Sequence, residues 1–211
     1  MARNLDPKCK QCRRIGEKLF LKGERCNSTK CALVKRKYPP GVHGPKRRIR
    51  VSEYGLQLRE KQKAKKMYRL METQFANYVK KAMNLSGDAG NNLLGLLEQR
   101  LDSVLYRTGI VKSRDAARQA ISHGLIKVNG KKVDIPSYIL RVGEVVTVKD
   151  SSILVKQFKE EGAKTKKENE SLPNWISLDP KILEIKVLTA PDAADLPHNL
   201  DIRLIIEYYS R

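Results

Sequence analysis

Four cysteines near the start of the chain form the clearest group of residues that could do chemistry. Cys9 and Cys12 make a CxxC pair, Cys26 and Cys31 make a Cx4C pair, and the chain has no other cysteine. Each pair can supply two corners of a tetrahedron, and the thirteen-residue loop between the pairs is long enough to bring both to one ion. Four thiolates are soft ligands that favour zinc and leave no position for a water. The spacing therefore predicts one structural zinc ion (Zn) and no catalytic metal.

Two other uses of these cysteines are open at this stage. Two disulfides would also satisfy four thiols, but nothing in the sequence indicates secretion, and cytosolic thiols are kept reduced. A thioredoxin-like redox role for Cys9 and Cys12 is disfavoured, because no strand precedes the pair and no βαβ pattern surrounds it. Zinc is the favoured interpretation.

The charge of the chain points to a polyanionic partner. The sequence has 43 Lys and Arg against 23 Asp and Glu, a net charge of +20, and residues 1–70 alone carry +17. An excess of this size is usually compensated by nucleic acid or by an anionic membrane. No stretch approaches the ~18 apolar residues of a spanning helix, and the opening MARNLDPKCK lacks the apolar centre of a secretory signal. We therefore expect a cytoplasmic protein that binds nucleic acid and no membrane.

A basic segment rich in proline and glycine, VKRKYPPGVHGPKRRIR, covers residues 34–50. Its three prolines and two glycines exclude a regular helix or strand. The rings of Tyr38 and His43 could stack on unpaired bases, while the basic side chains could contact phosphates. A disordered tail or an ordinary linker would lack the cysteines, caps and aromatic groups that interrupt this arm. The RNA contacts expected in the arm are Arg13, Arg14, Arg36, Lys37, Tyr38, His43, Lys46, Arg47, Arg48 and Arg50.

A helix is predicted over residues 52–68, because Ser52 is a good N-cap and Lys65 and Lys66 suit the last turn. Its apolar stripe of Tyr54, Leu58 and Met67 is thin, so most of its surface should be positive, as in a helix laid along a polyanion. The RNA contacts expected here are Tyr54, Arg59, Lys61, Lys63 and Lys65. Further on, four apolar residues at helical spacing are assigned to the core: Phe75, Val79, Ala82 and Met83.

Residues 92–148 predict a small unit of two helices and a sheet. One amphipathic helix is expected over residues 92–107, and Ser113 caps a second that ends near residue 123. Asn129 and Gly130 lie between two short apolar segments, a strong hairpin signal, and residues 145–148 add a strand. The RNA contacts expected here are Ser113, Arg114, Arg118, Gln119, His123 and Asn129.

The C-terminal part carries weaker signals. We expect a helix over residues 151–160, a charged loop over 162–170, a strand over 175–178 and a last strand over 202–208 that closes a sheet. Trp175 is assigned to the core rather than to base stacking. The whole chain is thus predicted to be an α+β protein in four parts: a zinc-binding and extended basic arm (1–50), a helical region (51–98), an RNA-binding module with a helix pair and β-hairpin (99–160), and C-terminal strands packing back on the helical body (161–211).

Residues 93–138, LLGLLEQRLDSVLYRTGIVKSRDAARQAISHGLIKVNGKKVDIPSY, resemble the RNA-binding module of the family of bacterial small-subunit ribosomal protein four. The segments YPPGVHG and SEYGLQLREKQK of the arm and the ending EYYSR are also similar to this family, and the four cysteines fit its zinc-bearing form. The resemblance covers nearly the whole chain. Asp115 stands where the family usually has a basic or amide side chain, and Leu125 where a His is common, which implies some loss of positive charge on the RNA face.

The resemblance implies a primary binder of 16S rRNA that acts in the five-prime domain, nucleates assembly of the small subunit, and lies near the mRNA entrance with a role in translational accuracy. It implies a monomer within the ribosome, next to small-subunit protein five. Whether the chain represses its own mRNA stays open.

Two other classes of function were weighed against a structural ribosomal component. An RNA-modifying or tRNA-acting enzyme carrying the same module would need a catalytic domain, but the chain has three histidines and no GxSxG, HExxH or GK(S/T) motif. A zinc-finger DNA-binding regulator fits less well, because an extended arm with stacking groups suits folded RNA better than a duplex major groove. We therefore predict no catalytic residue, no small-molecule substrate and no enzymatic activity.

Overall fold

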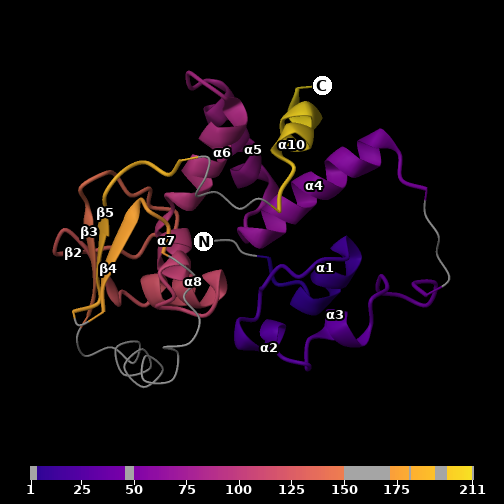
Figure 1. Cartoon of the computed structure of the whole chain (residues 1–211), viewed down its shortest axis with the longest axis horizontal. Coiled ribbons are helices and arrows are strands. Elements are labelled where there is room, and N and C mark those ends of the chain that lie inside the picture. The colour runs from indigo at the N-terminus through magenta and orange to yellow at the C-terminus, as the bar shows by residue number, and fades with distance from the viewer. Residues whose placement is uncertain (1–3, 46–49, 150–171, 181, 193–198, 211) are drawn as a thin grey trace. The chain divides into compact units, whose positions relative to one another are not determined.

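The computed structural model describes residues 4–45, 50–149, 172–180, 182–192 and 199–210 (Figure 1). The chain forms two compact units: the first combines Met1–Leu93 with Pro197–Arg211, and the second is Leu94–Leu196. Helices together with a small antiparallel sheet agree with the predicted α+β class. The helix and the loop expected over 151–160 and 162–170 lie outside the described residues. None of the described helices is long and apolar enough to cross a membrane.

Three short helices form the N-terminal part of the first unit: α1 (Lys8–Ile15), α2 (Glu24–Asn27) and α3 (Ala32–Lys35). Helix α1 ends at Gly16, whose φ of +89° is a left-handed conformation that glycine adopts without strain. The chain turns there, and Ile15, Leu19 and Leu21 are buried. This turn returns the chain toward α1, so that the second pair of cysteines can approach the first.

Three further helices belong to the first unit: α4 (Glu53–Met67), α5 (Glu72–Met83) and α10 (Ile202–Tyr209). The predicted cap of α4 is confirmed, since Ser52 Oγ accepts a hydrogen bond from the Gly55 N–H at 3.2 Å. Figure 1 shows α10 next to α4 and α5, and α10 contacts both. Phe75, Val79 and Ala82 are buried as predicted, whereas Met83, at the end of α5, is 42% exposed and its core assignment is wrong.

The strand predicted over residues 202–208 is wrong, because these residues form helix α10. Their isoleucines and tyrosines have a high strand propensity, but propensity is weak beside tertiary packing. Asp201 caps the helix by accepting a hydrogen bond from the Leu204 N–H at 3.4 Å, and Ile205 is buried. Packing on α4 and α5 therefore decides the conformation of this segment.

The single helix predicted over residues 92–107 is divided into α6 (Ala89–Glu98) and α7 (Leu101–Arg107). At the break, Arg100 has an extended backbone and pairs with Ile139 in an antiparallel bridge. The Leu101 N–H donates to the Tyr138 carbonyl at 2.8 Å, and the Leu140 N–H donates to the Gln99 carbonyl at 2.9 Å. Backbone groups that a continuous helix would pair locally are thus satisfied by a distant segment.

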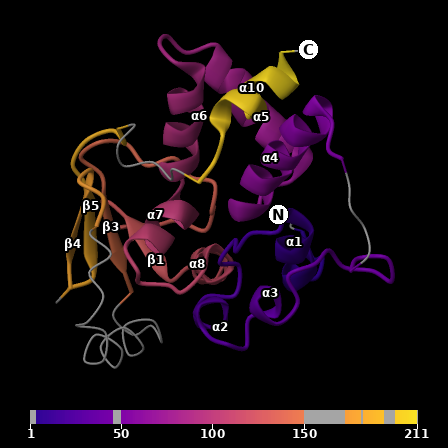
Figure 2. The same ribbon diagram turned by 45° about the vertical axis from the view of Figure 1, so that its right-hand side comes forward.

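The second unit packs α7 and α8 (Arg114–Ser122) against a five-stranded antiparallel sheet, as Figure 2 shows. The described strands lie in the order β2-β1-β3-β5-β4, with bounds β1 (Ile126–Val128), β2 (Lys131–Lys132), β3 (Val145–Val148), β4 (Ile176–Asp179) and β5 (Glu184–Val187). Val146 pairs with Val128 on one side and Ile185 on the other, and all three are buried in one core. Trp175 is 1% exposed in this core, which confirms its assignment.

The predicted hairpin is confirmed between β1 and β2. Asn129 and Gly130 have φ values of +47° and +77°, the left-handed pair that a tight two-residue turn requires. The side chain of Asn129 also accepts a hydrogen bond from the Val145 N–H at 2.9 Å, which ties the turn to β3. The Asn129 side chain therefore links the hairpin turn to the neighbouring strand.

The N-cap of α8 gives a direct test of this fold. Ser113 Oγ accepts a hydrogen bond from the Ala116 N–H at 3.2 Å, and we expect Ser113→Ala to lower the free energy of unfolding by about 1 kcal/mol. The measurement is urea unfolding of the second unit, followed by fluorescence of Trp175, the only tryptophan of the chain. Ser122→Ala, an exposed position at the other end of α8, is the matched control and should change little. Equal effects of the two variants would contradict the cap.

Candidate nucleic-acid interface

All four cysteines line one small cavity in the first unit. Helix α1 carries Cys9 and Cys12, Cys26 lies in α2, and Cys31 immediately precedes α3. The cavity has a volume of about 20 Å³, close to that of one bound water or ion. The four thiols are free, three of them are buried, and the Lys22 N–H donates to Cys26 Sγ at 3.3 Å. The fold therefore brings the two pairs together as their spacing predicts.

The four thiols of this cavity are the donor type that a structural zinc ion takes. Burial raises the pKa of the Cys12 thiol, a backbone N–H at Leu19 lowers it, and the neighbouring thiolates of Cys26, Cys9 and Cys31 raise it further. A cation among these sulfurs would offset both the burial and the mutual repulsion. Within the described ranges, no three His, Cys, Asp or Glu side chains are arranged tightly enough to hold a metal ion. Zinc binding therefore stays a prediction.

The basic arm folds back on α1 through one arginine. Arg13 donates from Nε to the Tyr38 carbonyl at 3.0 Å and from Nη2 to the Pro39 carbonyl at 3.3 Å. Its guanidinium also lies 4.9 Å from the centre of the Tyr38 ring. Of the RNA contacts predicted in the arm, the structure exposes Arg14, Arg36, Lys37, His43 and Arg50, while Lys46, Arg47 and Arg48 lie outside the described residues.

Helix α4 differs from the expected positive surface, because two of its lysines are buried. Lys61 Nζ lies 2.7 Å from Glu72 Oε1 and 4.5 Å from the centre of the Tyr208 ring. Lys63 Nζ lies 2.8 Å from Glu17 Oε2 and 3.6 Å from Glu60 Oε2. Each of these lysines is 4% exposed, so both act first as internal ion-pair partners. Apart from Glu60, the partners named here lie outside α4, which is why the helical pattern alone could not place these lysines.

The other three α4 residues of the predicted interface also have partners in this chain. Arg59 donates to the carbonyl of Ile15, and Lys65 Nζ lies 2.7 Å from Glu72 Oε2. Tyr54 is 50% exposed rather than on an inner face, with its ring centre 5.8 Å from that of Tyr208. Whether RNA also contacts these side chains stays a prediction.

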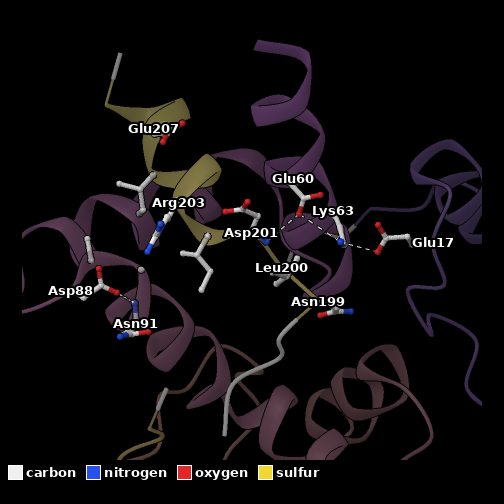
Figure 3. A pocket seen from close by; sticks show the side chains of 14 residues that line it. Glu17, Glu60, Lys63, Asp88, Asn91, Asn199, Leu200, Asp201, Arg203 and Glu207 are labelled. Carbon is white, nitrogen blue, oxygen red and sulfur yellow. Dashed lines mark hydrogen bonds and ion pairs between the residues drawn. The ribbon is translucent and has the colours of Figure 1, made fainter. Parts of the chain in front are cut away.

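A wide groove of about 1280 Å³ opens in the first unit beside α4 and α10 (Figure 3). Its carboxylates outnumber its cations: Glu17, Glu60, Asp88, Asp201 and Glu207 face only Lys63 and Arg203. An excess of negative charge disfavours phosphate. Several of these carboxylates act in the fold: one oxygen of Asp88 accepts a hydrogen bond from the Asn91 N–H at 2.8 Å, and Glu60 accepts one from the Asp201 N–H at 3.4 Å. Lys63 is the groove residue that the sequence analysis predicted to bind RNA, and here it pairs with Glu17 and Glu60.

In the second unit, the residues predicted to bind RNA divide into exposed groups and groups held by the fold. Gln119 and His123 are exposed at the C-terminal end of α8. Arg114 is 8% exposed, lies 4.5 Å from the centre of the Tyr106 ring and pairs with Glu98 at 3.4 Å. Arg118 pairs with Asp102 at 2.7 Å. The residues that sequence reasoning missed are therefore Glu98 and Asp102, whose spacing of four residues could have suggested a shared helix face.

Two family models match consecutive parts of the chain. The ribosomal protein S4/S9 N-terminal domain matches residues 3–98, and the S4 domain matches residues 99–146. Similar proteins include small ribosomal subunit proteins uS4 from Halothermothrix orenii, 49% identical over 213 residues, and from Clostridioides difficile and Thiobacillus denitrificans, each 48% identical over 211 residues. In all three comparisons, both chains are covered over 100% of their length.

The two models and the architecture of helices and small sheet define a ribosomal protein that carries an S4 domain. The chain belongs to the uS4 family of small-subunit ribosomal proteins. This is a family of structural ribosomal proteins rather than enzymes, so the prediction that the chain is not an enzyme is confirmed.

The site around Glu72 predicts a pH dependence of stability. Burial alone would raise the pKa of Glu72, but hydrogen bonds from Lys61, Lys65 and Tyr209 outweigh it and lower the pKa from 4.5 to about 2. Because the folded-state pKa is the lower one, the contribution is fully present above about pH 4.5 and is lost as the pH falls toward 2. We expect Glu72→Gln to destabilise the first unit at pH 6 and to become equal to the wild type near pH 2.

The measurement is urea unfolding at a series of pH values, followed by the NMR amide signals of α4. Glu53→Gln, at an exposed position in α4, is the control and should show no such convergence. A Glu72→Gln difference that stays constant from pH 6 to pH 2 would contradict this account of the Glu72 pKa.

Proposed function

We propose that this chain is a structural constituent of the small ribosomal subunit that binds 16S rRNA. Similarity to uS4 proteins over the full length of both chains is the observation that carries the proposal. The net charge of +20 supports it, because a chain of this charge needs a polyanion to offset its own repulsion. The uS4 family places the chain on the ribosome.

The finer part of the proposal rests on the family resemblance. In it, the chain is a primary binder of the five-prime domain of 16S rRNA, nucleates assembly, and lies near the mRNA entrance with a role in accuracy. Small-subunit protein five is its proposed neighbour. The exposed cations of the arm, among them Arg14, Arg36 and Lys37, support phosphate contacts along that part of the chain.

One zinc ion held by Cys9, Cys12, Cys26 and Cys31 is the proposed cofactor. Convergence of the four sulfurs on one cavity of about 20 Å³ supports it. A bound zinc ion would supply four metal–sulfur bonds and no reaction chemistry, because four thiolates close its coordination shell. The helices α1, α2 and α3 are short, so cross-linking them would stabilise the arm in a single conformation.

Binding to ribosomal RNA across a salt series tests the main proposal. We expect tight, saturable binding of the purified full chain to 16S rRNA, which weakens steeply with salt because each phosphate contact adds ~0.7 to 0.9 to the log-log slope. The affinity for an unrelated structured RNA of equal length and for duplex DNA should be at least tenfold lower. This bound is cautious, because specific nucleic-acid binding is usually tighter than non-specific binding by a factor of roughly 10³ or more. Equal affinity for all three would leave only a generic basic protein.

A single cysteine change tests the zinc site. We expect the wild-type chain to carry about one zinc ion, since four cysteines make one tetrahedral site. Cys9→Ser should lose the metal and speed amide exchange in roughly the first thirty residues, while residues 100–148 stay protected because they have their own core. Faster exchange throughout the chain would contradict this independence, and a metal-free wild type would contradict the zinc site.

A further inference from the structure

Glu98, at the end of α6, holds two arginines of the second unit. Arg107 donates from Nε to Glu98 Oε2 and from Nη2 to Glu98 Oε1, both at 2.9 Å, which is a bidentate pair. Arg114 reaches the same carboxylate with Nη2 at 3.4 Å and donates from Nε to Ser103 Oγ at 3.3 Å. Glu98 is only 1% exposed, so these bonds form away from solvent.

Asp102, four residues further along the chain and in α7, repeats this arrangement. Arg100 donates from Nε to Asp102 Oδ1 at 3.0 Å and from Nη2 to Oδ2 at 2.8 Å, again as a bidentate pair. Arg118 donates from Nε to Asp102 Oδ2 at 2.7 Å. Ser103, the residue after Asp102, accepts a hydrogen bond from Arg114, so the two arrangements are adjacent. The six charged side chains therefore form two neighbouring clusters around α7, α8 and the end of α6, which together we call the α7–α8 network.

In each half of this network, one arginine is more buried and the other reaches the surface. The side chains of Arg100 and Arg114 are 0% and 8% exposed, whereas those of Arg118 and Arg107 are 12% and 26% exposed. Four guanidinium groups and two carboxylates leave these six side chains with more positive than negative charge. A phosphate that reaches the two partly exposed guanidinium groups would therefore be attracted to them.

The hydrogen bonds to the carboxylates determine how the outer arginines meet a phosphate. Arg107 is held by the bidentate pair with Glu98, whereas Arg118 donates from Nε to Asp102 beside the bidentate pair of the inner Arg100. A guanidinium that is free to rotate loses conformational entropy when it binds a phosphate, but one already fixed by a carboxylate has lost most of that freedom on folding. The planar fork of arginine makes this fixing effective, since two parallel hydrogen bonds define the plane of the group. Lysine, a point charge on a flexible chain, could not be held in this way.

We infer that Glu98 and Asp102 are positioning residues, which fix the guanidinium groups of Arg107 and Arg118 for contact with phosphates of ribosomal RNA. The inference rests on the proposed function and adds Arg107 to the residues of the interface. The carboxylates do not contact the RNA. They act through the arginines that they hold.

The sign of one effect separates positioning from simple electrostatics. Glu98→Gln removes a negative charge from the RNA-binding module, so a purely electrostatic surface would bind RNA more tightly. Positioning requires the opposite result, because Arg107 and Arg114 lose the charged partner that orients them. We expect the affinity for 16S rRNA to fall roughly tenfold, the loss of about one charge-assisted hydrogen bond, and the salt slope to fall by ~0.7 to 0.9.

Binding is measured on the full chain at a temperature at which Trp175 fluorescence shows the second unit folded. Asp134→Asn is the matched control: Asp134 is exposed in the same unit, and its loss changes the net charge equally without removing an arginine partner. The control should bind RNA as tightly as the wild type or slightly more tightly. Glu98→Gln binding that equals or exceeds that of Asp134→Asn would overturn the inference while leaving rRNA binding by the wild type intact.

A second variant decides the matter if Glu98→Gln does not fold. Arg107→Lys keeps the charge at a partly exposed position but loses the bidentate fork. Positioning predicts a roughly tenfold loss of affinity for this variant as well, again the value of about one charge-assisted hydrogen bond. Unchanged affinity and an unchanged salt slope would overturn the inference. A wild-type chain that fails to bind 16S rRNA would instead contradict the proposed function itself.

Discussion

Repulsion among the cations is the constraint on which the structure of this chain depends. With a net charge of +20, its lysines and arginines repel one another, and carboxylates placed between them reduce this repulsion. A few acidic residues do this in both units: Glu72 holds Lys61 and Lys65, and buried Asp102 holds Arg100 and Arg118. Each of these carboxylates serves two cations. The sparse acidic residues are therefore placed at the junctions between elements.

This sharing divides the basic side chains into two groups with different roles. Buried cations such as Lys63, which bridges Glu17 and Glu60, stabilise the fold and are shielded from water. Exposed cations of the arm have no comparable shielding and supply the positive surface that a polyanion requires. The outer arginines of the α7–α8 network are intermediate, because they are held by the fold and still reach the surface.

Features encoded by neighbouring residues could be predicted from the sequence. Ser52 and Ser113 cap their helices, and Asn129 with Gly130 makes the hairpin, because each signal acts over three or four residues. The features that could not be predicted depend on distant partners. Residues 202–209 form a helix because they pack on α4 and α5. Helices α6 and α7 are separate because the residues between them pair with residues 138–140. Lys61 can be buried because Glu72, from α5, forms an ion pair with it. The approach of the four cysteines to one cavity could be predicted, because the thirteen residues between the two pairs are enough for the chain to fold back.

The first unit contains residues from both sides of the second unit in the sequence, since α10 packs on α4 and α5. During synthesis, the ribosome therefore completes residues 94–196 before α10 exists. Until Tyr209 is added, Glu72 lacks one of its three hydrogen-bond donors and Lys61 lacks the two rings that cover it. The order of translation thus makes consolidation of the first unit a late event. A nascent chain halted before Asp201 would already contain all residues of the second unit, while the surface of α4 and α5 that α10 covers would still be exposed.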